Sequence, residues 1–137
     1  MSAFNKYQTA VEKLTESANI GTDTWRIILS NTAPDAATDT NQASASELTT
    51  SGGYTVNGNT CAVTSSTQTG GTQKLVLASP AAWTGSGGGF TYRYAILWNQ
   101  TIDALFGYWD KGASQAVAAG ETLTVNLDGT NGVFTVQ

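Results

Sequence analysis

Apolar residues near the start of the chain recur at intervals of three and four, the spacing that gives a helix one apolar face. The residues with this spacing are Phe4, Tyr7, Val11, Leu14 and Ala18. Ser2 suits an N-cap and Gly21 suits a C-terminal stop, so the pattern predicts a helix from about residue 3 to residue 18. Two roles are open for the apolar face: it covers the core of the domain itself, or it forms an arm that docks on a partner.

From Gly21 onward the period changes to two, which is the spacing of β-strands. Strands are predicted at residues 24–30, 54–56, 61–64, 74–78, 90–99, 105–109, 122–127 and 132–136. The last two runs flank Asp-Gly and Asn-Gly turn signals, so we expect them to form a C-terminal hairpin. About eight short strands favour a mainly β fold, a jelly-roll-like β-sandwich over residues 21–137, preceded by a short helix within residues 1–20.

The run at residues 90–99 has the most regular alternation in the chain. Strict alternation places Phe90, Tyr92, Tyr94, Ile96 and Trp98 together on one face. The opposite face becomes apolar towards its end, which predicts a strand in the middle of a sheet, covered on both sides.

Two segments lack strand periodicity and are candidate contact surfaces. Residues 31–53 are predicted to form a long loop, with a helical turn near residues 46–48, and loops of this length are typically functional or disordered. Residues 85–89 are rich in glycine and are predicted to be a flexible connector. They lack the Gly-Lys-Ser/Thr ending of a phosphate-binding loop, so we do not expect a nucleotide there.

Charge is sparse, at 12% of the residues, where a typical soluble domain has about 25%. The net charge is −4 and the six basic residues are scattered, which argues against nucleic acid as a partner. No apolar run approaches the ~20 residues of a membrane helix, and no leader peptide is evident, so we expect synthesis in a cytoplasm and no membrane partner. The lone cysteine, Cys61, is expected to be an inert core residue.

The chain contains no histidine, which removes the commonest general base and metal ligand. We therefore expect no catalytic residues, no cofactor and no metal. Asp103 and Asp110 flank an aromatic segment and are the candidate pair for glycoside cleavage, but both positions suit Asp for local reasons. A sugar-stacking platform is open to the tryptophans at 83, 98 and 109, although their alternation favours the core.

The order of these features resembles small virion proteins of tailed bacteriophages and prophages, which act as head decoration, or cement, proteins. The segments that carry the resemblance are residues 4–7, 23–34, 52–54, 93–99, 107–110, 120–125 and 131–133. Together they extend over nearly the whole chain. The resemblance implies a jelly-roll-like fold, self-association on the outside of a capsid and no catalytic residues.

From the resemblance and the residues together we expect a capsid decoration protein on the virion surface. Its partners would be the major capsid protein and further copies of itself, as a homodimer or homotrimer. The candidate partner interface is the apolar face of the helix, formed by Phe4, Tyr7, Val11 and Leu14. The alternative is a tail or head fibre or spike module that binds host surface glycans through its aromatic residues and the glycine-rich segment.

Overall fold

A computed structural model describes residues 2–137 and confirms a mainly β chain with one short helix and several antiparallel sheets. The strands are β1 (Asn5–Lys6), β2 (Trp25–Ser30), β3 (Asn59–Cys61), β4 (Val63–Thr69), β5 (Thr72–Leu77), β6 (Trp83–Thr84), β7 (Phe90–Asn99), β8 (Ala104–Val117), β9 (Thr122–Leu123) and β10 (Phe134–Val136). The helix α1 spans Thr9–Glu16, and a single 3-10 turn, η1, spans Gln42–Ser44.

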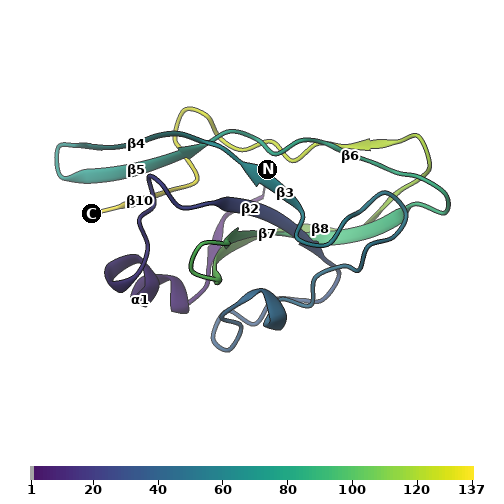
Figure 1. The fold of residues 1–137 in the computed structure, drawn as a ribbon, viewed down its shortest axis with the longest axis horizontal. Helices are drawn as coiled ribbons and strands as arrows, with labels where there is room; N and C mark the ends of the chain where they lie inside the picture. The colour runs from purple at the N-terminus through teal and green to yellow at the C-terminus, as the bar shows by residue number, and fades with distance from the viewer. Residues whose placement is uncertain (1) are drawn as a thin grey trace.

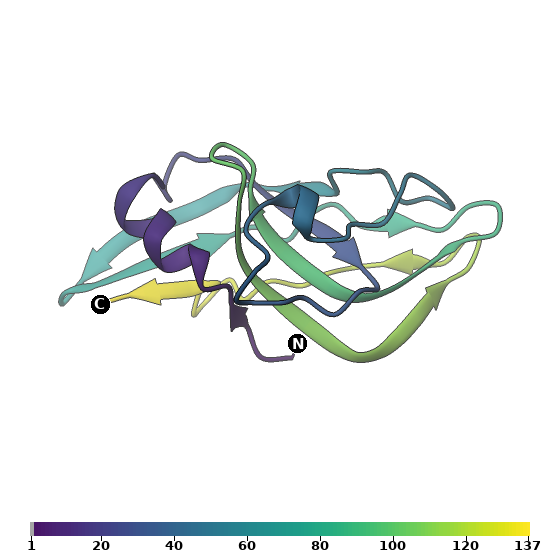
Figure 2. The ribbon, with the colours of Figure 1, turned by 90° about the horizontal axis from the view of Figure 1, so that it is seen from below.

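The strands form three sheets, and one face of the largest is covered by the other two. The five-stranded sheet has the order β1-β8-β7-β2-β3, the second sheet the order β10-β5-β4, and β6 pairs with β9. In Figure 1 the two smaller sheets lie above the large one, while α1 and the loop that carries η1 lie below it. Seen from below, β8, drawn in green, is strongly bent along its length (Figure 2). The chain passes from the large sheet to the second one between β3 and β4, across a single residue.

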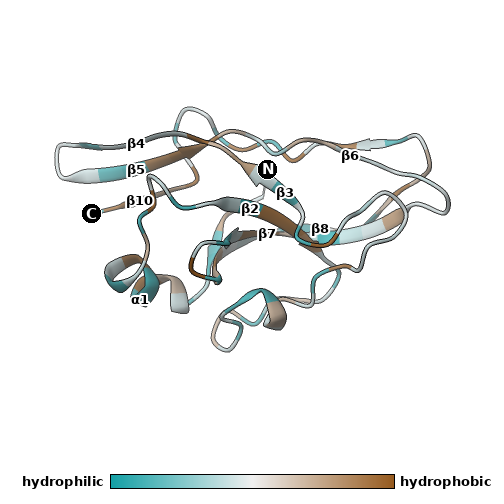
Figure 3. Cartoon of the chain, viewed as in Figure 1, coloured by the Kyte–Doolittle hydropathy of each residue, from teal (hydrophilic) through white to brown (hydrophobic). Residues whose placement is uncertain are grey.

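Apolar side chains pack in two layers, one on each face of the five-stranded sheet. The inner layer lies between the sheets and includes Trp25, Ile27 and Leu29 of β2, as their alternation predicts. The outer layer lies beneath the loop of residues 31–53 and includes Ile28 of the same strand. Figure 3 shows brown, hydrophobic stretches along β2 and β5. The large sheet is therefore covered on both faces.

Strand β7 lies between β2 and β8, which confirms its predicted central position. Its faces do not follow strict alternation, because a bulge sets residues 111–114 of β8 opposite Arg93. Tyr92 therefore belongs to the inner layer, whereas Tyr94 and Ile96 belong to the outer layer. The prediction of one common face for the residues from 90 to 98 was wrong, because a bulge interrupts the pleat and re-aims the side chains beyond it.

The N-terminal helix is shorter than predicted, because residues 5–6 form β1 and pair with β8. Phe4 lies over Gly107 of β8, where a Cβ atom would overlap its ring. Tyr7 is 0% exposed and belongs to the outer layer. Packing against β8 thus holds the first residues of the apolar stripe in an extended conformation. Of the four predicted interface residues, only Val11 and Leu14 lie on α1.

The predicted C-terminal hairpin is also wrong, because β9 pairs with β6 and β10 pairs with β5. Alternation over residues 122–127 reflects burial rather than pairing, since Val125 is 5% exposed although it lies outside any strand. The Asp-Gly and Asn-Gly pairs close a local turn instead. The Asp128 carboxylate accepts hydrogen bonds from the backbone N–H groups of Thr130 and Asn131.

The loop of residues 31–53 is folded onto the outer face of the large sheet. Its helical turn lies at η1 rather than at residues 46–48. The Glu47 carboxylate accepts hydrogen bonds from the Tyr54 hydroxyl at 2.5 Å and from the backbone N–H of Asn57 at 2.6 Å. Asn41 caps η1 through the backbone N–H of Ser44. These bonds to side chains take the place of a regular secondary structure in holding the loop.

Candidate functional site

An apolar groove lies between α1 and β10, at the end of the molecule where the N- and C-terminal segments meet. Its volume is about 380 Å³, and it is lined by side chains from four elements. Its apolar lining comes mainly from Phe4, Val11, Leu14, Phe106, Phe134 and Val136. Val11 is 51% exposed, and apart from Val56 no other large hydrophobic side chain in residues 2–137 is classed as exposed. The groove therefore offers apolar surface that the described residues, 2–137, leave uncovered.

Phe4 is held in this groove by aromatic neighbours and by a glycine. Its ring centroid lies 5.1 Å from that of Trp109 and 6.3 Å from that of Phe134. The pairing of β1 with β8 sets the register, with Lys6 opposite Gly107. Because Gly107 has no side chain, the Phe4 ring can lie directly on the strand.

Strand β10 borders the groove and is an edge strand, because it pairs with β5 alone. An edge strand presents backbone donors and acceptors on its unpaired side, which an extended peptide can use. Lys6 also lines the groove, whereas the charged residues of α1 do not. The groove thus combines an apolar floor, an unpaired strand edge and one cation at its rim.

Three of the four predicted interface residues are brought together here, namely Phe4, Val11 and Leu14. Tyr7 is not, because it is fully buried on the other face of the sheet and cannot contact a partner. Burial raises the pKa of Tyr7 above its ordinary value, and its hydroxyl has no hydrogen-bond partner within residues 2–137. The prediction that Tyr7 belongs to the interface is therefore wrong.

Sequence reasoning missed the far side of the groove, which comes from Phe106, Phe134 and Val136. The period-two spacing of Phe134 and Val136 placed both on one face, so a signal was present for part of it. Which element this face would meet could not be read from spacing, because α1 and β10 lie more than a hundred residues apart in the sequence.

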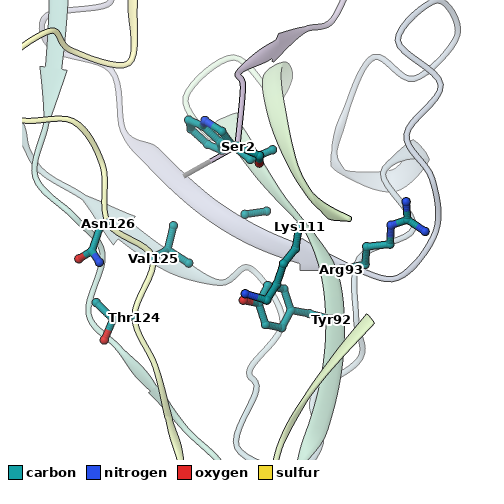
Figure 4. A pocket seen from close by; sticks show the side chains of 9 residues that line it. Ser2, Tyr92, Arg93, Lys111, Thr124, Val125 and Asn126 are labelled. Atoms are coloured by element: carbon teal, nitrogen blue, oxygen red, sulfur yellow. The ribbon is translucent and has the colours of Figure 1, made fainter. Parts of the chain in front are cut away.

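A second, more polar pocket lies between the β7–β8 pair and residues 124–126, with a volume of about 380 Å³. Figure 4 shows Tyr92 and Lys111 facing Thr124 and Asn126 across this opening, while Arg93 points away from it. The guanidinium of Arg93 donates two hydrogen bonds to Asp110, at 2.8 and 3.0 Å. The pocket therefore offers hydroxyl, amide and ammonium groups around its opening.

The aromatic side chains do not form an exposed stacking platform. Trp83 and Trp98 are each 4% exposed, and Trp109 is 7% exposed. The indole N–H of Trp98 donates to the Asp103 carboxylate at 2.9 Å. These tryptophans are core residues, and the reading of their alternation as core is confirmed.

The carboxylates of Asp103 and Asp110 each form hydrogen bonds with different parts of the structure. Asp103 accepts hydrogen bonds from Trp98 and from the backbone N–H of Gln42. The pKa of Asp110 is lowered by its hydrogen bond to the Arg93 side chain and by the backbone N–H of Gly112. Seven residues of a mostly extended chain hold the two carboxylates roughly 20 Å apart. Glycoside cleavage needs a separation of about 5–9.5 Å, so these two residues do not form such a pair.

No group of three or more His, Cys, Asp or Glu side chains within residues 2–137 is placed to hold a metal ion. Cys61 is 2% exposed, and burial raises the pKa of its thiol to about 12, as expected for an unreactive core residue. Within the same range, no helix has the length and apolar character needed to span a membrane.

Comparisons of the chain with models of protein families, with curated proteins and with solved structures found no match.

Proposed function

We propose that this chain is a capsid decoration protein of a tailed bacteriophage. It binds the outer surface of the major capsid protein shell and stabilises that shell through self-association and contacts between capsomers. The observation that carries the proposal is the uncovered apolar groove between α1 and β10, with Val11 exposed on its rim. The resemblance in the sequence supplies the partner, and the groove supplies a surface on which that partner can bind.

The occupant of the groove is an extended segment of the major capsid protein. Such a segment adds to the free edge of β10 by backbone hydrogen bonds, while its alternate side chains enter the groove beside Phe4 and Val11. Lys6 at the rim favours an acidic residue next to the apolar ones. Each 100 Å² of apolar area covered contributes about 2.5 kcal/mol, before the cost of ordering the segment.

The remaining surface suits many weak, repeated contacts. Only 12% of the residues are charged, so neighbouring copies on a shell repel each other little. Repetition over the shell turns modest single contacts into strong overall binding. The jelly-roll-like arrangement belongs to the same proposal and is supported by two facing sheets and by the crossing of the chain between β3 and β4. Catalysis, cofactors, nucleic acid and membranes have no part in this role.

Binding to shells provides the test. Purified shells that lack the protein are mixed with it and sedimented, and the bound fraction is measured for the wild type, Val11→Asp and Val56→Asp. Val56 is the matched control, because it is 45% exposed and does not line the groove. We expect saturable binding of the wild type and of Val56→Asp, and at least ~10-fold weaker binding of Val11→Asp, since a buried unpaired carboxylate costs more than 1.4 kcal/mol.

Two outcomes would contradict this proposal. If the wild type stays in the supernatant, the capsid is not its partner. If Val11→Asp and Val56→Asp bind alike, the groove is not the contact surface.

The polar pocket of Figure 4 favours a second candidate function, a fibre or spike module that binds host glycans. Lys111, Thr124 and Asn126 would supply the hydrogen bonds to sugar hydroxyl or carboxylate groups. A glycan-array signal that is lost in Asn126→Ala, with only a few copies of the protein per virion, would favour this candidate over capsid decoration.

A further inference from the structure

Within residues 2–137 the outer edge of β4 has no strand partner, although Gly21, between α1 and β2, lies against the Ser66 side chain. β4 is seven residues long and pairs with β5 alone. No hydrogen bond joins the backbone of residues 64–69 to any described segment other than β5. Figures 1 and 2 show the β4–β5 hairpin reaching out at one end of the molecule, with no strand on the outer side of β4.

The turn of this hairpin determines which backbone groups are unpaired. Gly70 and Gly71 have φ angles of 60° and 87°, and Thr69 stands opposite Thr72, as in a two-residue turn with both central residues at positive φ. In such a hairpin the residues next to the turn are hydrogen-bonded to each other, and bonded and non-bonded pairs then alternate. The N–H and C=O groups of Ser66 and Gln68 consequently point away from β5.

The devices that usually block an exposed edge are missing from this one. Native proteins protect long edge strands with lysine, proline or inward-pointing charge. Residues 64–69 of β4 contain no charged residue and no proline, and the bulge lies only at the start of the strand, between Val63 and Ser65. The side chains of residues 64–69 are Thr, Ser and Gln, so a strand that pairs here would be held mainly by backbone hydrogen bonds.

Charge makes a second copy of the chain the best occupant of this edge. The chain carries a net charge of −4, yet it has no acidic residue between Glu47 and Asp103. The charged side chain of the hairpin is Lys74, and its ammonium donates to the backbone carbonyl of Thr130. Two such edges can therefore approach without facing carboxylates from residues 48–102.

We infer that β4 pairs antiparallel with β4 of a second copy across a two-fold axis, so that the second sheet continues from one protomer into the other. An antiparallel pair of identical strands is self-complementary, as a two-fold interface requires. The contact is a strand edge rather than a broad face, so the dimer is weak in solution and gains from the high local concentration on a surface.

This inference deepens the proposed function, because it names the surface through which a decoration protein associates with its own copies. Its test uses the isolated protein, so its outcome does not depend on whether the capsid is the partner. A failed shell-binding experiment with a positive result here would leave a dimeric protein with another partner. Binding to shells without dimerisation of the isolated protein would support capsid decoration and exclude the pairing of β4 strands.

Amide hydrogen exchange measured by NMR at micromolar and millimolar protein provides the readout. The N–H groups of Ser66 and Gln68 have no acceptor within one protomer, so they exchange fast at low concentration and slow down at least ~10-fold at high concentration. The N–H groups of Ser65 and Thr67 bond to β5 and serve as internal references that stay protected at both concentrations.

Sedimentation of Thr67→Lys and Ala113→Lys supplies the matched pair of variants, since both positions are exposed and both changes add one charge. Like charges near the two-fold axis weaken the dimer at least ~10-fold in Thr67→Lys, while Ala113→Lys dimerises like the wild type. A protein that stays monomeric at millimolar concentration overturns the inference. A dimer that forms equally well in both variants, or without protection of Ser66 and Gln68, overturns it as well.

Discussion

Replacing Gly107 by alanine tests how the N-terminal segment is held against β8. A Cβ atom at this position would overlap the ring of Phe4, which packs on the strand surface there. Gly107 is not at positive φ, so alanine fits the backbone and the overlap is the perturbation. The added methyl group must push the Phe4 ring away from Trp109 and out of its place in the groove.

The expected cost follows from the packing. Overpacking of this kind lowers the unfolding free energy by about 1–3 kcal/mol. Up to ~1 kcal/mol of this loss is offset, because alanine loses less conformational entropy on folding than glycine does. Phe4→Ala costs about 1–3 kcal/mol, because the ring is only half buried. In the Phe4→Ala background the new methyl group meets open space, so Gly107→Ala becomes neutral or slightly stabilising. The coupling between the two positions is therefore about 1–3 kcal/mol.

Urea denaturation of the wild type, both single variants and the double variant measures this coupling in a double-mutant cycle. We expect Gly107→Ala alone to lower the urea concentration at the unfolding midpoint, and this loss to disappear when Phe4 is also replaced by alanine. If Gly107→Ala destabilises the protein equally with and without the Phe4 ring, the ring does not lie on Gly107 and the described wall of the groove is incorrect.

Three further predictions concern the core, the loop and the response to pH. Glu47→Ala removes the acceptor of the buried Tyr54 hydroxyl and of the Asn57 N–H, so it should lower the unfolding free energy by about 2 kcal/mol. Glu47→Gln keeps an acceptor oxygen and should lower the unfolding free energy less. Urea denaturation of both variants checks this, and equal costs would contradict the role of residue 47 as a hydrogen-bond acceptor. Cys61 should resist alkylation in the native protein at pH 8, because burial raises the pKa of its thiol to about 12. When urea is added, the thiol should react at the rate of unfolding. Mass spectrometry measures the labelling, and rapid labelling of the native protein would contradict the burial of Cys61. Three carboxyl groups have lowered pKa values in the folded state: Asp35 through the backbone N–H of Ala37, Asp110 through the side chain of Arg93, and Asp128 through the backbone N–H of Asn131. The stability that these carboxylates contribute is complete above the unfolded-state pKa of 3.8 and is lost as the pH falls through the lower folded-state values. Because the chain also has no histidine, the melting temperature should change little between about pH 5 and pH 8 and should decline below about pH 4. A steep decline of the melting temperature near pH 6 would contradict this assignment.

Elements with strong local patterns were predictable from the sequence. β2 and β7 combine β-branched and aromatic residues with turn signals at their ends, and both occur where they were expected. The central position of β7 followed from its two apolar faces, because only a covered strand can bury both. Bulges leave no such signal, so the change of face at Arg93 could be seen only in the pairing with β8.

Features that depend on distant contacts were not predictable in this way. The stripe through Phe4 and Tyr7 has helical spacing, but this segment is extended in the structure. Residues 5–6 pair with the edge of β8, and the Phe4 ring packs over Gly107. The partners of β9 and β10 lie 38 or more residues away in the sequence, beyond the reach of turn chemistry. For the groove, the sequence identified Val11 and Leu14, while the opposing face from Phe134 and Val136 required the fold.

Imaging of decorated shells, at a resolution that resolves α1 and β10, would test the proposed role of the groove at its most specific point. We expect α1 and β10 to face the shell, with an extended segment of the major capsid protein beside β10 and its apolar side chains next to Phe4 and Val11. Density for this chain that leaves the groove open to solvent, or shells that carry no such density at all, would contradict the account.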